Sequence, residues 1–204
     1  MNVIVVGAGI DGLATAWSLV KAGHSVSLVE QGAKIPNPLA ASGDHHRIIR
    51  RAYGQAAGYG RLISEAYEAW DELWADLGES HLDAQGFICV SREEGDEAEQ
   101  YRDGLAAGGF PFGMVEPDEA VKRWPFLEAG SFRYVFFSPE GGALHCRRIA
   151  AGLVRWLRAN GANLYENSRV TEVDADAGRV TLESGETMRA DRVVVTAGAW
   201  VLNL

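Results

Sequence analysis

The sequence predicts an α/β fold: a parallel sheet that opens with a strand–helix–strand unit and is interrupted by an inserted α+β segment. The runs VIVV (3–6) and VSLV (26–29) are short and continuously apolar, which is typical of strands buried in a parallel sheet. Between them, apolar residues recur at helical spacing, and Gly23 stands where a helix would end. A later valine run (193–195) predicts that the chain returns to the same sheet.

After the opening unit, residues 61–77 are predicted to form a second helix, because apolar residues recur along one face and Gly78 follows. From about residue 81 the predicted elements become short and mixed, which indicates a second domain. The elements expected there are strands at 86–90, 112–116 and 132–137 and helices at 93–107 and 118–124, the last with Asp118 as its N-cap.

The last part of the chain returns to α/β character. A helix is expected at 147–160, with Gly161 after it, followed by a β-meander from residue 168 with turns at 176–178 and 184–185. We therefore expect one discontinuous domain formed by residues 1–80 and 144–204, and an inserted domain formed by residues 81–143.

The composition excludes several classes of protein. A net charge of −9 argues against a nucleic-acid-binding surface. No membrane span is predicted, because the sequence lacks a run of about 18 apolar residues. Cys89 and Cys146 are isolated, as expected for thiols of a protein in the reducing cytoplasm, and no secretory signal precedes the first strand. No metal site is expected, because His45 and His46 diverge as neighbours and no further ligand is suitably spaced.

A glycine-rich motif, GAGIDG (7–12), joins the first predicted strand to the first helix. Gly7 permits the tight turn, Gly9 lets the backbone approach a pyrophosphate, and Gly12 lets the helix pack closely on the strand. The helix N-terminus offers unpaired N–H groups to the phosphates. Glu30 follows the second strand, where its carboxylate can accept hydrogen bonds from ribose hydroxyls and would repel a 2′-phosphate. These features predict a Rossmann-like dinucleotide-binding site that disfavours NADP.

Further motifs, in order along the chain, resemble the D-amino-acid-oxidase-like family of FAD-dependent oxidoreductases. They are ASGDHHRIIRRAYG (41–54), KRWP (122–125), SPEGGAL (138–144), SRV (168–170) and TAGAW (196–200). Within the family, the chain resembles most the sarcosine-oxidase and N-methyltryptophan-oxidase branch, which has Arg-Ile-Ile-Arg-His-Ala-Tyr-Gly where this chain has RIIRRAYG (47–54). The resemblance implies that the discontinuous domain binds FAD and that residues 81–143 are part of a substrate-binding domain.

The resemblance implies FAD as the cofactor, bound in an extended conformation. By matching positions, the implied contacts are Gly7, Gly9, Ile10, Asp11 and Gly12 for the pyrophosphate; Glu30 for the adenosine ribose; Val170 for the adenine; Ser42, His46 and Arg47 for the ribityl chain and flavin edge; and Ala197, Gly198 and Trp200, which would close on the cofactor. One departure is Asp44-His45-His46, where the branch has Gly-Asp-Thr, so we expect His46 to meet the flavin differently.

Two arginines are the catalytic candidates. Arg50 matches an arginine that pairs with the substrate carboxylate, a task that suits the guanidinium fork. Arg47 matches an arginine near the flavin, where positive charge stabilises the anionic reduced ring. The implied reaction moves a hydride equivalent from the α-carbon of an amino acid or N-methyl amino acid to the flavin. The imine product then hydrolyses, and O2 takes up the electrons to give H2O2.

Two other function classes stay open. One is a flavin-dependent amine dehydrogenase that passes electrons to a quinone or a partner protein. The other is a non-catalytic FAD-binding subunit. An NAD-dependent dehydrogenase is disfavoured, because it explains neither TAGAW (196–200) nor the arginine segment.

Members of the family continue well past the turn that matches TAGAW (196–200), so the resemblance implies that this chain corresponds to the N-terminal half of an oxidase. A sheet edge and apolar faces would then be exposed. We therefore expect the chain to dimerise or to pair with a complementary polypeptide.

Overall fold

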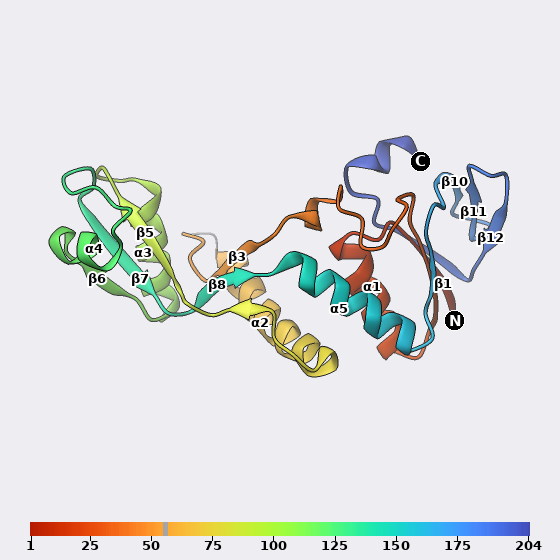
Figure 1. Cartoon of the computed structure of the whole chain (residues 1–204), viewed down its shortest axis with the longest axis horizontal. Coiled ribbons are helices and arrows are strands. Elements are labelled where there is room, and N and C mark those ends of the chain that lie inside the picture. Colours follow the sequence, from red (N-terminus) through yellow and green to blue (C-terminus); the bar gives the residue numbers. More distant parts are fainter. Residues whose placement is uncertain (55–56) are drawn as a thin grey trace. The chain divides into compact units, whose positions relative to one another are not determined.

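In the computed structural model, which describes residues 1–54 and 57–204, the chain forms two compact units, and Figure 1 labels their elements. Unit 1 comprises Met1–His46 and His145–Leu204, and unit 2 comprises Arg47–Leu144. The first boundary therefore falls at residue 46 and not at the expected residue 80. The reason is that β3 (Arg47–Arg50) pairs with β8 (Gly141–Leu144), so the segment after residue 46 is built into unit 2.

Unit 1 is built on a parallel sheet with the strand order β13–β1–β2–β9. The strands are β1 (Asn2–Val6), β2 (Ser25–Val29), β9 (Asn163–Tyr165) and β13 (Arg192–Val195). β1 pairs with β2 on one side and with β13 on the other, so the predicted return of the last valine run to the opening sheet is confirmed. The central strand is buried from Val3 to Val6, as its continuous apolar run predicts.

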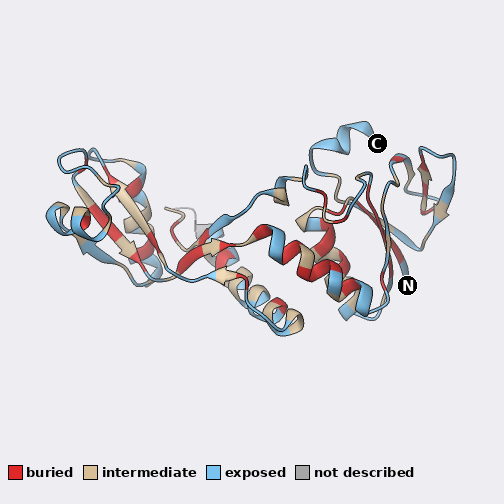
Figure 2. Cartoon of the chain, viewed as in Figure 1, coloured by how far each residue is buried: buried red, intermediate tan, exposed pale blue. Residues whose placement is uncertain are grey.

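Two helices and a meander complete unit 1. α1 (Ile10–Lys21) and α5 (Cys146–Ala159) contact each other, and Figure 2 shows buried residues along both. The antiparallel meander consists of β10 (Val170–Asp174), β11 (Arg179–Leu182) and β12 (Thr187–Arg189). Its Val180 and Leu182 pack against Ile4 and Val6 of β1. The meander therefore shields one face of the parallel sheet from water. Two short 3-10 turns, η1 (Ala41–Gly43) and η2 (Gly198–Asn203), belong to the loops.

Unit 2 contains two antiparallel three-stranded sheets, with the orders β3–β8–β4 and β5–β7–β6. The remaining elements are β4 (Leu82–Asp83), β5 (Phe87–Ser91), β6 (Gly113–Val115), β7 (Tyr134–Ser138), α2 (Ala57–Leu77), α3 (Glu97–Gly108) and α4 (Pro117–Arg123). On β7, Phe136 joins a core with Leu105 of α3, and its neighbour Val135 joins a core with Ala120 of α4. The two-residue period of a strand thus supplies both faces of the sheet with apolar side chains.

All three helices of unit 2 begin elsewhere than the sequence predicts, and α2 begins at Ala57 instead of residue 61. α4 starts at Pro117 with Glu116 as its N-cap, so the prediction of Asp118 as the cap is wrong. Proline is well suited to the first turn of a helix, because the N–H it lacks would have no partner there. α3 starts only at Glu97, because Gly95 has a positive φ of 77° and Asp96 caps the helix.

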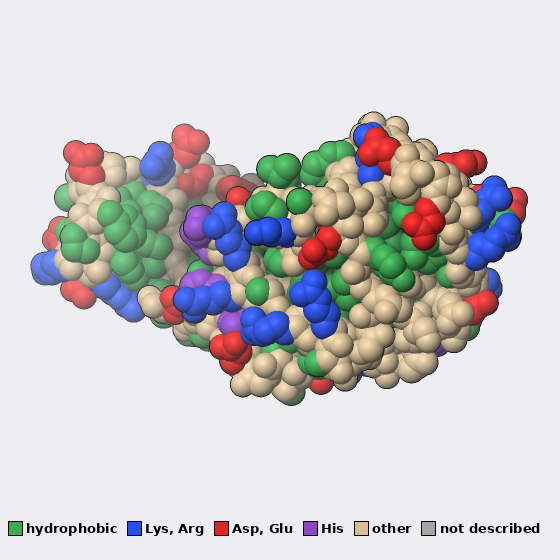
Figure 3. Space-filling model, turned by 45° about the vertical axis from the view of Figure 1, so that its right-hand side comes forward, with side chains coloured by type: hydrophobic (Ala, Val, Ile, Leu, Met, Phe, Trp, Pro, Cys, Tyr) green, Lys and Arg blue, Asp and Glu red, His purple; other side chains and the backbone are tan. Residues whose placement is uncertain are grey.

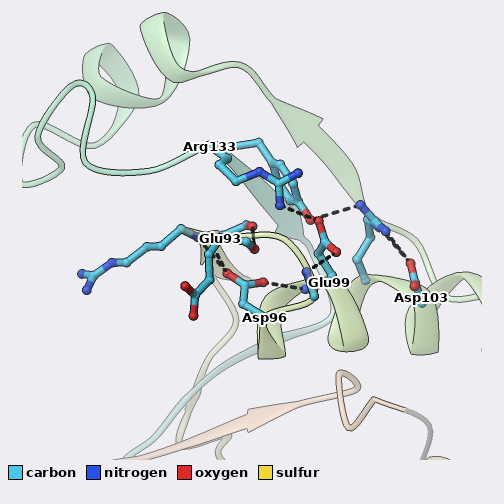
Figure 4. Close-up of polar contacts among 10 residues, drawn as sticks. Glu93, Asp96, Glu99, Asp103 and Arg133 are labelled. Carbon is cyan, nitrogen blue, oxygen red and sulfur yellow. Dashed lines mark hydrogen bonds and ion pairs between the residues drawn. The ribbon is translucent and has the colours of Figure 1, made fainter.

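Figure 4 shows the polar contacts around Asp96, the N-cap of α3. The pKa of its carboxylate is lowered. Asp96 accepts hydrogen bonds from the backbone N–H groups of Arg92 at 2.7 Å and Glu99 at 3.1 Å. Burial by itself would raise the pKa of Asp96, but the bonds from Arg92, Glu99 and Glu93 outweigh it and lower the pKa. Glu99 in turn accepts from the N–H of Gly95 at 2.8 Å, which contributes most to its own lowered pKa, and pairs with Arg133.

The Asp96→Asn substitution is expected to reduce the acid sensitivity of unit 2. The pKa of Asp96 is lower in the folded than in the unfolded chain. Its carboxylate therefore contributes stability above the unfolded value of about 3.9, and this contribution is lost as the pH falls through the folded value. Asparagine is also a good N-cap but does not titrate. Thermal unfolding of both proteins between pH 2 and pH 7 tests this, and parallel losses of stability in acid would contradict it.

The surface carries side chains of every class. On the face drawn in Figure 3, acidic and basic side chains lie close to one another, and apolar side chains also reach the surface. Leu202 in η2 is 91% exposed.

Within residues 1–54 and 57–204, no helix has the length and apolar character needed to cross a membrane. In the same described ranges, no three His, Cys, Asp or Glu side chains gather in a way that could hold a metal ion.

Candidate cofactor site

A pocket of about 330 Å³ lies in unit 1, lined by the ends of β1 and β2 with the loops that follow them, by the turn after β13 and by the residues around the start of β10. In open parallel sheets, ligands bind outside the carboxyl ends of the strands, where the loops meet. The predicted cofactor residues that line this pocket are Gly7, Gly9, Ile10, Asp11, Glu30, Ser42, Val170, Ala197, Gly198 and Trp200. The structure therefore brings together residues from both ends of the chain.

The three glycines of the GAGIDG motif have different surroundings. Gly7 adopts a φ of +100°, and its N–H donates to the Val29 carbonyl at 2.8 Å, which joins the turn to β2. A Cβ on Gly12 would overlap the carbonyl oxygen of Gly7, so this residue lies under the loop and outside the pocket lining. The backbone conformation therefore requires glycine at position 7, and the close packing of the chain requires glycine at position 12.

Gly9 differs from its two neighbours in the motif. A Cβ on Gly9 would meet only Ala40 Cβ and Ser42 Oγ, both at 3.8 Å, which is ordinary van der Waals distance. Its φ of −70° is open to any residue. Because no contact within the chain demands glycine here and the residue lines the pocket, the structure leaves room for a ligand to approach the backbone.

Glu30 is 5% exposed and lies at the end of β2, and hydrogen bonds fix its carboxylate on both sides. Oε2 accepts from the N–H of Ala8 at 2.8 Å, and Oε1 accepts from the N–H of Gly32 at 2.7 Å and from Asn37 Nδ2 at 2.9 Å. The buried charge is therefore compensated by three donors from two loops, the glycine-rich loop and the loop after β2. A carboxylate can also accept further bonds, because each oxygen has two lone pairs.

Asn37 is a pocket residue that the sequence analysis did not single out. It is 7% exposed, donates to Glu30, and accepts from the N–H of Leu39 at 2.9 Å through Oδ1. Both ends of its amide are thus used to shape the loop after β2. The local signal was weak, because Asn37 lies between two prolines in a segment typical of a turn.

The turn TAGAW (196–200) is joined directly to the glycine-rich loop. Thr196 Oγ1 lies 2.9 Å from the carbonyl oxygens of both Val6 and Gly7, and the Thr196 N–H donates to Val6 at 2.8 Å. The turn continues into η2, where the N–H of Trp200 donates to Ala197 at 3.0 Å. Thr196 was also not predicted as a site residue, yet its hydroxyl fixes the distance between the two loops.

The loop before β3 reaches the same pocket through Ser42. Its Oγ accepts from the N–H of Ile10 at 3.0 Å, so it satisfies a donor of the first turn of α1. Val170, at the start of β10, is buried beside the pocket. His46, in contrast, is exposed and does not belong to the pocket lining.

The two predicted catalytic arginines belong to unit 2. Arg47 begins β3 and is exposed, whereas Arg50 ends β3 and is half-buried. Arg50 Nη2 donates to the Tyr101 hydroxyl of α3 at 3.1 Å. The guanidinium of Arg50 is therefore already held by a neighbour in its own unit.

The Glu30→Gln substitution is expected to destabilise unit 1 even without a ligand. The new amide NH2 must replace one of the two oxygens, and donors face both positions. A buried donor left without an acceptor costs about 1–3 kcal/mol. Thermal unfolding measures the loss, with Glu186→Gln at an exposed position of unit 1 as the control, for which a change within about 0.5 kcal/mol is expected. Equal stabilities of the two variants would contradict the prediction.

Comparisons of sequence with known proteins agree with this geometry. A family model described as FAD dependent oxidoreductase (DAO) matches residues 2–204. Monomeric sarcosine oxidase from Bacillus sp. (strain B-0618) is 29% identical over 205 residues, which cover 98% of this chain and 51% of that protein. N-methyl-L-tryptophan oxidase from Yersinia pestis (strain Pestoides F) is 27% identical over 207 residues, which cover 100% and 55%. The chain thus spans about half the length of the curated relatives it matches.

Solved structures give the same result. An open form of NikD, described as an unusual amino acid oxidase essential for nikkomycin biosynthesis, matches with a TM-score of 0.84 and 27% identity, covering 99% of this chain and 52% of that one. Glycine oxidase from Geobacillus kaustophilus matches with a TM-score of 0.82 at 23% identity, covering 99% and 56%, which bears on the fold alone. The glycine-rich strand–helix turn and the fixed glutamate after β2 agree with the family model, which matches nearly the whole length. The chain therefore belongs to the DAO family of FAD-dependent oxidoreductases.

Proposed function

We propose that this chain provides the FAD-binding part and the carboxylate-binding arginine of an enzyme that oxidises an amino acid or N-methyl amino acid. The observation that carries the proposal is the pocket of unit 1, in which Gly9 is open to a ligand while Gly7 and Gly12 are fixed by the chain. Two relatives, a sarcosine oxidase and an N-methyl-L-tryptophan oxidase, support the substrate class by their activities.

The residues of the pocket fit FAD as follows. The backbone around Gly9 and the first turn of α1 would receive the pyrophosphate, where N–H groups and the helix dipole favour negative charge. Glu30 would accept from the adenosine ribose, and Ala197, Gly198 and Trp200 would close on the cofactor. FAD, when bound, supplies the acceptor of the hydride equivalent.

The two arginines of β3 would stabilise negative charge, one on the substrate carboxylate and the other near the reacting centre. Arg50 would bind the substrate carboxylate through its N–H groups, in the paired geometry that a guanidinium forms with a carboxylate. Arg47 would place a positive charge near the reacting centre, which stabilises negative charge that develops there. Neither side chain would transfer a proton, because a guanidinium stays protonated.

A visible absorption spectrum of the purified protein, taken before and after incubation with FAD and gel filtration, tests the first part. Flavin absorbance that co-elutes with the protein supports the proposal, whereas a colourless protein contradicts FAD binding by this chain. Anaerobic addition of N-methylglycine should then bleach the flavin, and admission of air should restore the colour with release of H2O2.

The alternatives predict different results in the same experiment. Bleaching with very slow recovery in air indicates a dehydrogenase with another electron acceptor. Bound FAD that no amine bleaches indicates a non-catalytic FAD-binding part. We also propose that the chain pairs with a second copy or a complementary polypeptide, because apolar side chains such as Leu202, which is 91% exposed, lie uncovered on the surface. A monodisperse, active monomer in light scattering would contradict that pairing.

A further inference from the structure

The guanidinium of Arg50 lies against the rings of two tyrosines of unit 2. Its Cζ lies 4.6 Å from the ring centroid of Tyr101, on α3, and 5.7 Å from that of Tyr53, just after β3. Nη2 also donates a hydrogen bond to the Tyr101 hydroxyl at 3.1 Å. One tyrosine therefore contacts the cation through both its ring and its hydroxyl, and it comes from a helix remote in sequence.

Tyr101 is itself oriented by Glu97, one turn earlier on α3. The Tyr101 hydroxyl donates to the Glu97 carboxylate, so its hydrogen points toward Glu97 and its lone pairs remain for Arg50. This hydrogen bond, followed by burial, raises the pKa of Tyr101, although the charge of Arg50 acts in the opposite direction. At neutral pH the phenol is therefore protonated, and it can donate to Glu97 and accept from Arg50 at once.

Most N–H donors of the Arg50 guanidinium remain available to bind an anion. A guanidinium carries five N–H donors, and within residues 1–54 and 57–204 Tyr101 is the hydrogen-bond acceptor of just one of them. A side chain that is already oriented loses less rotamer freedom when it binds a ligand, and a long arginine has much to lose. The contacts with Tyr101 and Tyr53 thus prepare the remaining donors for an anion.

We propose that Tyr101, oriented by Glu97, is a positioning residue that holds Arg50 ready to bind the substrate carboxylate. This inference rests on the proposed function of Arg50. It assigns a role to α3, which lies in the segment inserted between the two parts of unit 1. Tyr101 would set the affinity for the carboxylate and would leave the rate of the chemical step unchanged.

The Tyr101→Phe variant of the FAD-loaded protein tests the proposal, because it keeps the ring and removes the hydroxyl. Anaerobic stopped-flow reduction of the flavin by N-methylglycine gives a Kd and a limiting rate, and N-methylglycinamide serves as the uncharged probe. We expect the Kd for N-methylglycine to rise about fivefold to tenfold. The limiting rate and the Kd for the amide should stay within about twofold of wild type.

Two further variants accompany the test. Glu97→Gln, which keeps the Tyr101 hydroxyl but removes the charge that orients it, should raise the Kd for N-methylglycine by about twofold to threefold. Tyr134→Phe is the matched control. Its hydroxyl accepts from Arg102 Nη1 at 3.0 Å, an equivalent tyrosine–arginine bond that does not involve Arg50, so both constants should stay as in wild type.

The outcomes separate this inference from the proposed function. If Arg50→Lys abolishes the preference for N-methylglycine over its amide but Tyr101→Phe does not reduce it, Arg50 binds the carboxylate and the role of Tyr101 is refuted. A lower limiting rate at unchanged Kd in Tyr101→Phe would also overturn the inference. If the wild-type protein shows no preference for the carboxylate, the proposed function of Arg50 fails, and the inference fails with it.

Discussion

The Gly12→Ala substitution is expected to destabilise unit 1 strongly. The added Cβ would overlap the carbonyl oxygen of Gly7 and lie 2.7 Å from Thr196 Oγ1. The first of these neighbours is backbone, so α1 would have to move away from β1. Overpacking typically costs about 1–3 kcal/mol. The overlap with backbone places this substitution at about 3 kcal/mol, which corresponds to a fall in Tm of roughly 6–12 °C for a chain of this size.

Thermal unfolding followed by circular dichroism measures this effect in the absence of any cofactor. Gly9→Ala is the matched control, because it adds the same methyl group three residues earlier in the same motif with no close contact. Alanine is a poorer N-cap than glycine, so a loss of about 1 kcal/mol or less is expected for the control. A Gly12→Ala protein as stable as the control would mean that the helix and the loop are not tightly packed.

The Gly9→Ala substitution is expected to have the largest effect on FAD binding. The methyl group would enter the pocket at the point where the backbone is open to a ligand. If the pyrophosphate lies against Gly9, the affinity for FAD should fall at least about tenfold while the protein remains folded. Titration of the protein with FAD, followed by the change in flavin fluorescence, gives the two dissociation constants.

Ligand fragments locate the cause of the loss. ADP carries the pyrophosphate, so its affinity should fall in Gly9→Ala as that of FAD does. Adenosine lacks the phosphates, and its affinity should be the same in both proteins. Unchanged FAD affinity in Gly9→Ala would place the pyrophosphate away from this residue and would remove the main support for the proposed mode of binding.

The opening of the fold could be predicted from short sequence patterns. The strands β1 and β2, the helix α1 and the turn at Gly7 each follow from periodicity or from a glycine that the local conformation requires. The dinucleotide motif was recognisable for the same reason, because its residues are close together in sequence.

Other elements left too little local signal. β8 (Gly141–Leu144) begins with two glycines, which have low strand propensity, and it becomes a strand by pairing with β3 across about ninety residues. That pairing also assigns residues 47–80 to unit 2. A sequence pattern without strong periodicity could not reveal either fact.

The sequence by itself determined the α/β class, the glycine-rich turn and several of the residues that line the pocket of unit 1. Tertiary structure alone decided which side chains hold the functional candidates in place. Asn37 donates to Glu30, Thr196 Oγ1 lies against the carbonyl oxygen of Gly7, and in unit 2 the Tyr101 hydroxyl accepts from Arg50. The physical reason is that periodicity and turn chemistry act over a few residues. A buried carboxylate or an oriented guanidinium instead depends on donors and acceptors that folding brings from distant parts of the chain.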